Sequence, residues 1–276
     1  MHSLISKRLE RYAVLTDQQQ LQAAKEVMQE IALLGLYRGG FFKQAAFHGG
    51  TALRLAYGGD RFSEDLDFCL LSPDPDFRLQ QLLSPLQKEI EAWGIPTEVT
   101  PRGAVDATIQ KAFLKTHSLG SLLELANPIN PKQKIKVKIE LDINPPKGAV
   151  YHNKLHSFPV DFYLHCHDAA TMFAGKLNAL LTRDYAKGRD WYDFVLYVNN
   201  GVPVNFLFLK NALSQFEIAD VPDDLDRQWL VQRLTKRIQA MDVEKIKQDV
   251  LPFVLERDRL EIWSQQFFLD KLDQLV

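Results

Sequence analysis

Apolar and polar residues follow two different periods in the first half of the chain. Residues 17–34 place apolar side chains at helical spacing, which predicts an amphipathic helix capped by Asp17. Gly39 and Gly40 interrupt this pattern. Residues 134–143 alternate strictly, with branched apolar side chains at every second position and charged ones between them. This is the clearest strand in the sequence, and it predicts one buried face and one polar face.

Shorter patterns predict the remaining elements. We expect a short strand within 41–48, a helix over 51–57, strands over 61–71, 95–100 and 119–125, and a helix over 79–93. From about residue 167 onward the pattern is almost entirely helical. The chain is therefore predicted to be α+β, with a mixed-sheet core domain over residues 1–165 and a helical domain over residues 166–276.

Composition predicts an ordinary globular protein. The chain has 276 residues, of which 46% are hydrophobic and 25% are charged. No apolar run approaches the roughly 18 residues that a membrane-spanning helix needs. The N-terminus lacks the apolar core of a signal peptide, and two cysteines, Cys69 and Cys166, cannot make a disulfide framework. A cytoplasmic location without membrane contact is the expectation.

The charge pattern leaves room for a local nucleic-acid contact. A formal net charge of −2 argues against indiscriminate binding along nucleic acid, but phosphate contacts need only a cluster of cations. Lys132, Lys134, Lys136 and Lys138 alternate and would share one face of a strand. This face is either a solvated surface or a phosphate-contacting one, and the sequence does not decide between the two.

Two aspartates at alternate positions are the strongest chemical signal. Asp65 and Asp67 lie in the run DLDFCL, where residues i and i+2 of a strand point to the same face. The two carboxylates would repel each other unless a cation compensates them. Carboxylate oxygens are the ligands of hard divalent cations, so the pair predicts a site for Mg²⁺ or Mn²⁺.

A glycine turn precedes this pair and opens a short helix. Gly49 and Gly50 would present backbone N–H groups to an anion at a helix N-terminus. Thr51 either caps that helix or directs its hydroxyl at a triphosphate. Arg61 and Ser63 share strand parity with the aspartates and would point into the same site, where the arginine could contact phosphate or pair with a carboxylate. A phosphate cradle beside a metal-binding pair suggests chemistry on a nucleotide.

A third carboxylate is expected on a neighbouring strand, because metal-assisted displacement at phosphorus commonly uses one. The polar face of residues 134–143 offers Glu140 and Asp142. Asp142 is the preferred choice and Glu140 follows closely. The competing interpretation is that both are solvent-facing charges on an amphipathic strand.

The helical half holds a second polar group. Lys176 lies near the edge of an apolar helix face, where it could extend to water or reach a phosphate. Asp190 and Asp193 are three residues apart after a basic turn, so they could cap that helix and interact with its dipole. The histidines near Cys166 have no convincing zinc-ligand spacing.

Over roughly residues 15–200 the sequence resembles the AbiEii/AbiGii toxin family, the nucleotidyltransferase toxins of type IV abortive-infection systems. The resemblance is carried by the Gly-Gly-Thr turn with an R-x-S-x-D-x-D strand, by the polar-faced strand at 134–143, and by a helix lysine followed by a basic turn and D-x-x-D.

The resemblance implies a mixed-sheet nucleotidyltransferase core and a helical domain that closes the nucleotide cleft. It implies Mg²⁺-dependent transfer of a nucleotide from an NTP to an acceptor hydroxyl, with RNA, in particular tRNA, as the leading acceptor. Asp65 and Asp67 would bind the metal, and Lys176 and Asp190 would be needed for activity. Lys176 would also contact the triphosphate, and Asp193 would be a further nucleotide-site residue. A cognate antitoxin would act without binding the toxin tightly.

Two alternatives to RNA modification stay open at this point. Small-molecule nucleotidyltransferases of the antibiotic-modifying type share the glycine turn and acid pair, and a protein could also be the acceptor. A nucleotide-binding regulator without turnover is the non-enzymatic alternative.

Overall fold

The computed structural model describes residues 2–12, 16–104, 107–116, 134–216, 218 and 220–276. The chain forms two compact units. The first unit comprises Met1–Pro145 and His152–Cys166, and the second comprises Pro146–Tyr151 and His167–Val276. In the described part of the chain, no helix is long and apolar enough to cross a membrane.

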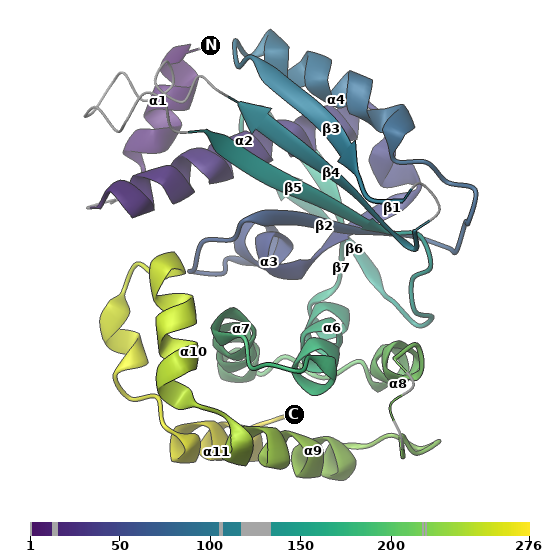
Figure 1. Ribbon diagram of the computed structural model, residues 1–276, viewed down its shortest axis with the longest axis vertical. Helices are drawn as coiled ribbons and strands as arrows, with labels where there is room; N and C mark the ends of the chain where they lie inside the picture. The colour runs from purple at the N-terminus through teal and green to yellow at the C-terminus, as the bar shows by residue number, and fades with distance from the viewer. Residues whose placement is uncertain (1, 13–15, 105–106, 117–133, 217, 219) are drawn as a thin grey trace. The chain divides into compact units, whose positions relative to one another are not determined.

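A mixed β-sheet forms the centre of the first unit (Figure 1). Within the described residues it has seven strands in the order β3-β4-β5-β2-β1-β7-β6. β2 runs antiparallel to β1 and parallel to β5, and β4 is antiparallel to both of its neighbours, β3 and β5. The strands are β1 (Ala45–His48), β2 (Asp65–Leu70), β3 (Thr97–Arg102), β4 (Ile109–Thr116), β5 (Ile135–Asp142), β6 (Tyr151–His156) and β7 (Phe162–His167). The predicted α+β class with a mixed sheet is confirmed.

Helices cover the apolar face of this sheet. The helices of the first unit are α1 (His2–Glu10), α2 (Asp17–Arg38), α3 (Gly49–Tyr57) and α4 (Gln80–Ala92), with a 3-10 turn at Phe41–Lys43. α2 packs on β5 and on α4, and α4 packs on β3 (Figure 1). The apolar side chains of β5, from Ile135 to Leu141, are fully buried on this side. The strict alternation of the strand therefore leaves Lys136, Lys138 and Glu140 on the opposite face.

The cap of the long helix differs from the prediction. Thr16, not Asp17, is the N-cap, because its side chain accepts a hydrogen bond from the backbone N–H of Gln19 while the Gln19 side chain accepts from the backbone of Thr16. The helix also continues past residue 34. Gly35 lies inside this helix where α4 approaches closely. A Cβ added to Gly35 would lie only 3.0 Å from the Cβ of Glu89, so the close approach favours glycine.

Several strands differ from their predicted bounds. The strand expected over 61–71 begins only at Asp65. The strand expected over 119–125 lies outside the described residues. β4 was not predicted, although it alternates between buried and half-exposed positions like its partner β5.

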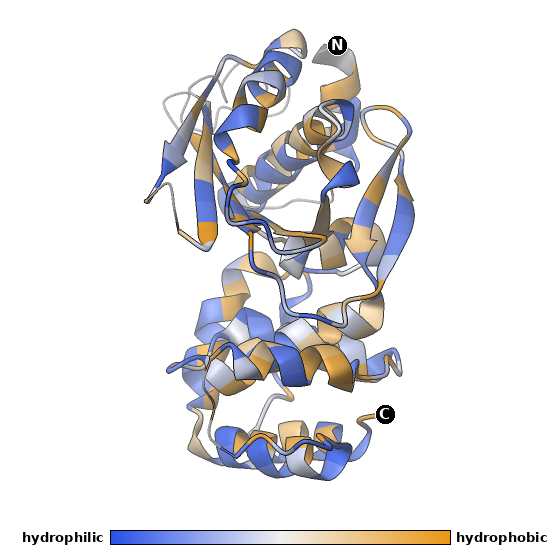
Figure 2. Cartoon of the chain, turned by 90° about the vertical axis from the view of Figure 1, so that its right-hand side faces the viewer, coloured by the Kyte–Doolittle hydropathy of each residue, from blue (hydrophilic) through white to orange (hydrophobic). Residues whose placement is uncertain are grey.

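The second unit is helical from Ala169 onward. Its helices are α6 (Ala169–Thr182), α7 (Gly188–Asn199), α8 (Phe206–Ser214), α9 (Arg227–Ala240), α10 (Val243–Val250) and α11 (Gln265–Asp273), with 3-10 turns at Leu251–Phe253 and Arg257–Leu260. α6 packs on α7, α8 and α9, and α7 packs on α10 and α11. Trp191, Phe194 and Phe268 form edge-to-face contacts in its core. Figure 2 shows apolar and polar residues alternating along these helices, as amphipathic helices around a core require.

Candidate active site

β2 presents its two aspartates on one face. Asp65 and Asp67 are both half-buried, while Leu66 and Phe68 between and after them are buried on the other face. Burial, and then the charge of Asp67, raises the pKa of Asp65 to about 6, although Lys138 opposes this shift. The chain has therefore placed two negative charges together at a desolvated position.

The glycine turn lies directly against this pair. β1 ends at His48 and α3 begins at Gly49, whose φ of 77° is a left-handed conformation that favours glycine. A Cβ added to Gly49 would overlap the carboxylate of Asp67, and one added to Gly50 would lie 2.7 Å from a guanidinium nitrogen of Arg61. The same Cβ would lie 2.8 Å from the hydroxyl of Ser63. The structure thus brings together the turn, the acid pair and both preceding polar residues.

Thr51 makes a contact that the sequence did not indicate. Thr51 is fully buried, and its hydroxyl donates a hydrogen bond to the backbone carbonyl of Asp65, so it does not cap α3. It instead ties the start of α3 to the start of β2. Arg61 and Ser63 precede β2, so strand parity does not place them in the site; their packing against Gly50 does.

The neighbouring strand β5 carries both candidate third carboxylates on this same face. Glu140 is the register partner of Asp67 in β2. Its carboxylate pairs with Lys138 at 2.8 Å and with Lys111 of β4 at 3.2 Å. Burial alone would raise the pKa of Glu140, but these two lysines hold it below its ordinary value.

Asp142, two residues further along β5, has a different environment. It accepts a hydrogen bond from the backbone N–H of Asn144 at 2.8 Å, and within the described residues it forms no ion pair. Burial raises the pKa of Asp142. Asp142 is thus better suited than Glu140 to accept a proton, because a carboxylate held by two ammonium groups is a weaker base.

The polar group of the second unit is an ion cluster between α6 and α7. Lys176 on α6 pairs with Asp190 at 2.8 Å and with Asp193 at 2.9 Å. The side chain of Lys176 is 13% exposed, and that of Asp193 is completely buried. Burial would raise the pKa of Asp190, but Lys176 and then Arg183 lower it below its ordinary range. The structure therefore assembles all three residues that the helical motif predicted.

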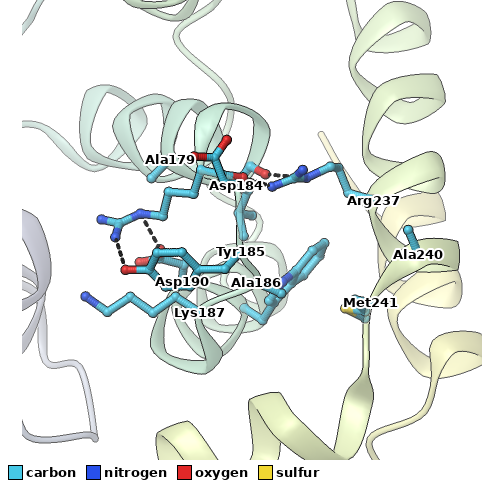
Figure 3. A pocket seen from close by; sticks show the side chains of 12 residues that line it. Ala179, Asp184, Tyr185, Ala186, Lys187, Asp190, Arg237, Ala240 and Met241 are labelled. Atoms are coloured by element: carbon cyan, nitrogen blue, oxygen red, sulfur yellow. Dashed lines mark hydrogen bonds and ion pairs between the residues drawn. The ribbon is translucent and has the colours of Figure 1, made fainter.

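A pocket opens beside this cluster (Figure 3). Its volume is about 140 Å³, and Arg183, Lys187, Asp190 and Arg237 line it together with apolar side chains. The Nε of Arg183 lies 3.1 Å from Asp190 Oδ2, close enough for an ion pair but without hydrogen-bond alignment. Arg237 donates to the backbone carbonyls of Leu180 and Arg183, which joins α9 to the end of α6.

Comparison with known proteins decides the family. Residues 31–271 match the family model described as the nucleotidyl transferase AbiEii toxin of type IV toxin–antitoxin systems. This chain belongs to the AbiEii family. It is therefore a nucleotidyltransferase-family enzyme of the toxin type, and family membership implies an NTP as nucleotide donor. A search of curated proteins finds no match.

Solved structures agree on the fold. MenT4, a nucleotidyltransferase toxin from Mycobacterium tuberculosis H37Rv, superposes with a TM-score of 0.62 at 17% identity, over 99% of this chain and 89% of that one. A proposed nucleotidyltransferase from H. pylori gives a TM-score of 0.52 at 19% identity, over 94% of this chain and 92% of that one. At these identities the likeness establishes the nucleotidyltransferase-like fold.

The β2 pair of this AbiEii protein fits a hard divalent cation. Among the described residues no group of three or more histidine, cysteine, aspartate or glutamate side chains is gathered for a metal. Mg²⁺ does not require one, since it is commonly held by one or two carboxylates together with water and substrate phosphates. Asp65 and Asp67 provide such carboxylates, and burial together with the neighbouring charge of Asp67 raises the pKa of Asp65.

Two charged residues of these clusters were not singled out from the sequence. Lys111 reaches Glu140 only because β4 pairs with β5, and no motif marks it. Arg183 follows Lys176 by seven residues, and residues seven apart lie on the same side of a helix. The sequence therefore contained a signal that Arg183 lies near Lys176.

Proposed function

We propose that this AbiEii protein transfers a nucleotide from an NTP to a hydroxyl of RNA, with tRNA as the leading acceptor. The observation that carries the proposal is the contact of the Gly49 turn with Asp67, because it places a helix N-terminus suited to phosphate beside a carboxylate pair suited to a divalent cation. Small-molecule and protein acceptors would use the same centre and are outcomes of the test below.

The residues have distinct proposed roles. The backbone N–H groups at Gly49 and Gly50 bind the triphosphate at the start of α3, and Arg61 offsets phosphate charge. Asp65 and Asp67 would hold Mg²⁺, which when bound supplies Lewis-acid stabilisation of the charge that develops on phosphate oxygens. Thr51 and Ser63 keep the turn and β2 in register.

The reaction is a displacement at the α-phosphorus of the NTP. The acceptor oxygen forms a new P–O bond as the bond between the α-phosphorus and the bridging oxygen to the β-phosphate breaks, and pyrophosphate leaves with the electron pair. The acceptor proton passes to a carboxylate of β5. Asp142 is the proposed base because Glu140 is held by Lys138 and Lys111.

The roles of Lys176, Asp190 and Asp193 rest on the AbiEii motif. Their mutual ion pairs give them an evident structural function in the second unit. We propose in addition that they are required for activity, with Lys176 acting on the triphosphate. A cognate antitoxin that neutralises without a tight complex is also proposed, and it would restore growth in co-expression without co-purifying.

The test incubates the protein with Mg²⁺, total cellular RNA and each labelled NTP in turn, with Asp65→Asn/Asp67→Asn as control. Label in a tRNA-sized band that the double variant loses is the expected result. Absence of RNA label with every NTP would reject the RNA acceptor. Mg²⁺ should also raise the melting temperature of the wild type but not of the double variant, because ligand binding stabilises only a fold that contains the site.

A further inference from the structure

A continuous row of side chains leads from the acid pair across the polar face of the sheet. The register pairs Asp67 with Glu140, Glu140 with Lys111, and Lys111 with Arg102. Residues paired in this way on neighbouring strands point to the same face. Three strand steps separate Asp67 from Arg102, which corresponds to roughly 14 Å. The row is therefore a short path that starts at the proposed reaction centre.

This polar face is rich in cations away from β2. On β3, β4 and β5 it carries Arg102, Lys111, Lys115, Lys136 and Lys138, against the carboxylates Glu98, Glu140 and Asp142. Glu140 is already engaged by Lys138 and Lys111. Arg102 and Lys136 are exposed, and Lys115 is half-exposed. Within the described chain, none of these last three forms an ion pair with a carboxylate, so their charges are available to an external anion.

A pocket lies at the end of the β3–β4 hairpin, beside the start of α4. It has a volume of about 310 Å³, and Arg102 and Lys111 line it together with Arg78, Leu79, Gln80, Leu83 and Gln110. The side chain of Gln110 faces the helices, because it accepts from the backbone N–H of Leu79 and donates to the carbonyl of Phe77. No acidic side chain is among the described residues that line it. The guanidinium of Arg78 donates only to the backbone carbonyls of Pro75 and Phe77, so its positive charge is not neutralised by a carboxylate.

An aromatic ring among these cations suggests which kind of polyanion fits. Phe113 on β4 is half-exposed on the polar face, and the Nζ of Lys136 lies 3.6 Å from the centre of its ring. Cations that follow a backbone, together with an aromatic surface on which bases stack, are the combination that binds single-stranded nucleic acid. An acidic protein segment would match the positive charges, but it has no bases to stack on the ring of Phe113.

We propose that this face binds the acceptor strand as single-stranded RNA, with its phosphates on Arg102, Lys115 and Lys136. The RNA then approaches Asp67 along the row of side chains from Arg102 through Lys111 and Glu140. The inference rests on the proposed nucleotidyl transfer and assigns a surface for its acceptor. The sequence left open whether the lysine face at 132–138 is solvated or contacts phosphate, and the proposal selects phosphate contact. Lys132 lies outside the described residues.

The test compares two triple variants that remove equal charge from the first unit. The test variant is Arg102→Gln/Lys115→Gln/Lys136→Gln, and the control is Lys7→Gln/Lys43→Gln/Lys88→Gln, all exposed lysines outside this face. Fluorescence anisotropy measures binding of a labelled, unstructured RNA of about 12 nucleotides, a length within the site sizes of single-strand-binding domains, without NTP or Mg²⁺. Thermal unfolding checks that both variants keep the wild-type fold.

The test variant should bind the RNA at least about tenfold more weakly than the wild type, and its slope of log K against log salt should fall by about 2, since each lost single-strand phosphate contact removes about 0.7. The control should bind like the wild type. Phe113→Leu should weaken RNA binding without weakening that of inorganic polyphosphate, because polyphosphate has no bases to stack.

Three results would overturn the inference. Equal RNA affinities of the two triple variants would show that this face does not bind the strand. Displacement of the RNA by polyglutamate as effectively as by unlabelled RNA would assign the face to an acidic protein instead. Failure of the proposed function is distinguishable, because binding is measured without donor or metal. RNA labelling by the test variant with a wild-type KM for RNA would leave the function standing and reject only this surface.

Discussion

The two aspartate pairs of this protein have opposite electrostatic states. On β2, burial and the charge of Asp67 outweigh the nearby Lys138, and the pKa of Asp65 is raised. On α7, Lys176 and Arg183 outweigh burial, and the pKa of Asp190 is lowered. In the first pair the charged form of Asp65 is disfavoured by burial and by its neighbour. In the second pair, Lys176 and Arg183 of the same unit compensate the carboxylates.

This difference shows that carboxylate pairs with similar spacing serve different purposes. Two like charges at a desolvated position repel each other, so the β2 pair gains from a cation supplied from outside. A buried pair that shares Lys176 joins α6 to α7, and removing this lysine leaves two desolvated carboxylates without their shared cation. Substitutions at the two pairs should therefore separate activity from stability.

Asp67→Asn should give the largest effect on activity and almost none on stability. Transfer of labelled nucleotide should fall by about 10³-fold or more, because a bound metal contributes several kcal/mol of charge stabilisation to the transition state. The amide keeps the size of the side chain beside Gly49 and removes one of two repelling charges, so the melting temperature should stay the same or rise. Unfolding of this variant would instead assign Asp67 a structural role.

Lys176→Met should give the largest loss of stability. Two buried carboxylates would lose their shared cation, which typically costs about 3–5 kcal/mol. Urea unfolding followed by circular dichroism measures this change. The matched control is Lys176→Met/Asp190→Asn/Asp193→Asn, which removes the stranded charges and should recover most of the loss. Wild-type stability of the single variant would contradict the structural part of the comparison.

Substitutions of the two β5 carboxylates should slow nucleotide transfer less than Asp67→Asn does, and by different factors. Asp142→Asn should slow transfer by roughly 10²-fold or more, as loss of a general base does, and should remove the acidic limb of the pH–rate profile. Glu140→Gln should slow it less, because Glu140 is already held by two lysines. Glu98→Gln, on the same face but outside the site, is the control. A larger effect at Glu140 would reverse the assignment.

The smallest expected effect is that of acid pH on the contribution of Asp190 to the free energy of unfolding. The folded-state pKa of Asp190 lies below its ordinary value of 3.8, so its contribution to stability is complete above that pH and is lost as the pH falls through the lowered pKa. The difference in free energy of unfolding between the wild type and Asp190→Asn should therefore shrink below about pH 4. A difference that stayed constant over this range would show that Asp190 is not stabilised as a charged group.

Much of the proposed centre could be predicted because its signals are local. The glycine turn, the alternation of Asp65 with Asp67 and the alternation of residues 134–143 each depend on neighbours a few positions away. The helical motif around Lys176 and Asp190 was recognisable for the same reason. The start of β2 was placed four residues too early, because Arg61 and Ser63 continue the alternation of the strand without forming it.

Other features depended on contacts between distant segments. The hydroxyl of Thr51 binds a carbonyl 14 residues away, so its role could not be read from the helix that it begins. Lys111 becomes a partner of Glu140 only through the pairing of β4 with β5.

The sequence by itself determined the residue types, the α+β class and the family, because side-chain periodicity and motif spacing are properties of the local chain. Only the tertiary structure decided which charges are balanced. Glu140 and Asp142 have the same spacing signal, yet one is held by two lysines and the other forms no ion pair in the described residues. The physical reason is that burial and neighbouring charges set the state of a carboxylate, and both arise from segments brought together by folding.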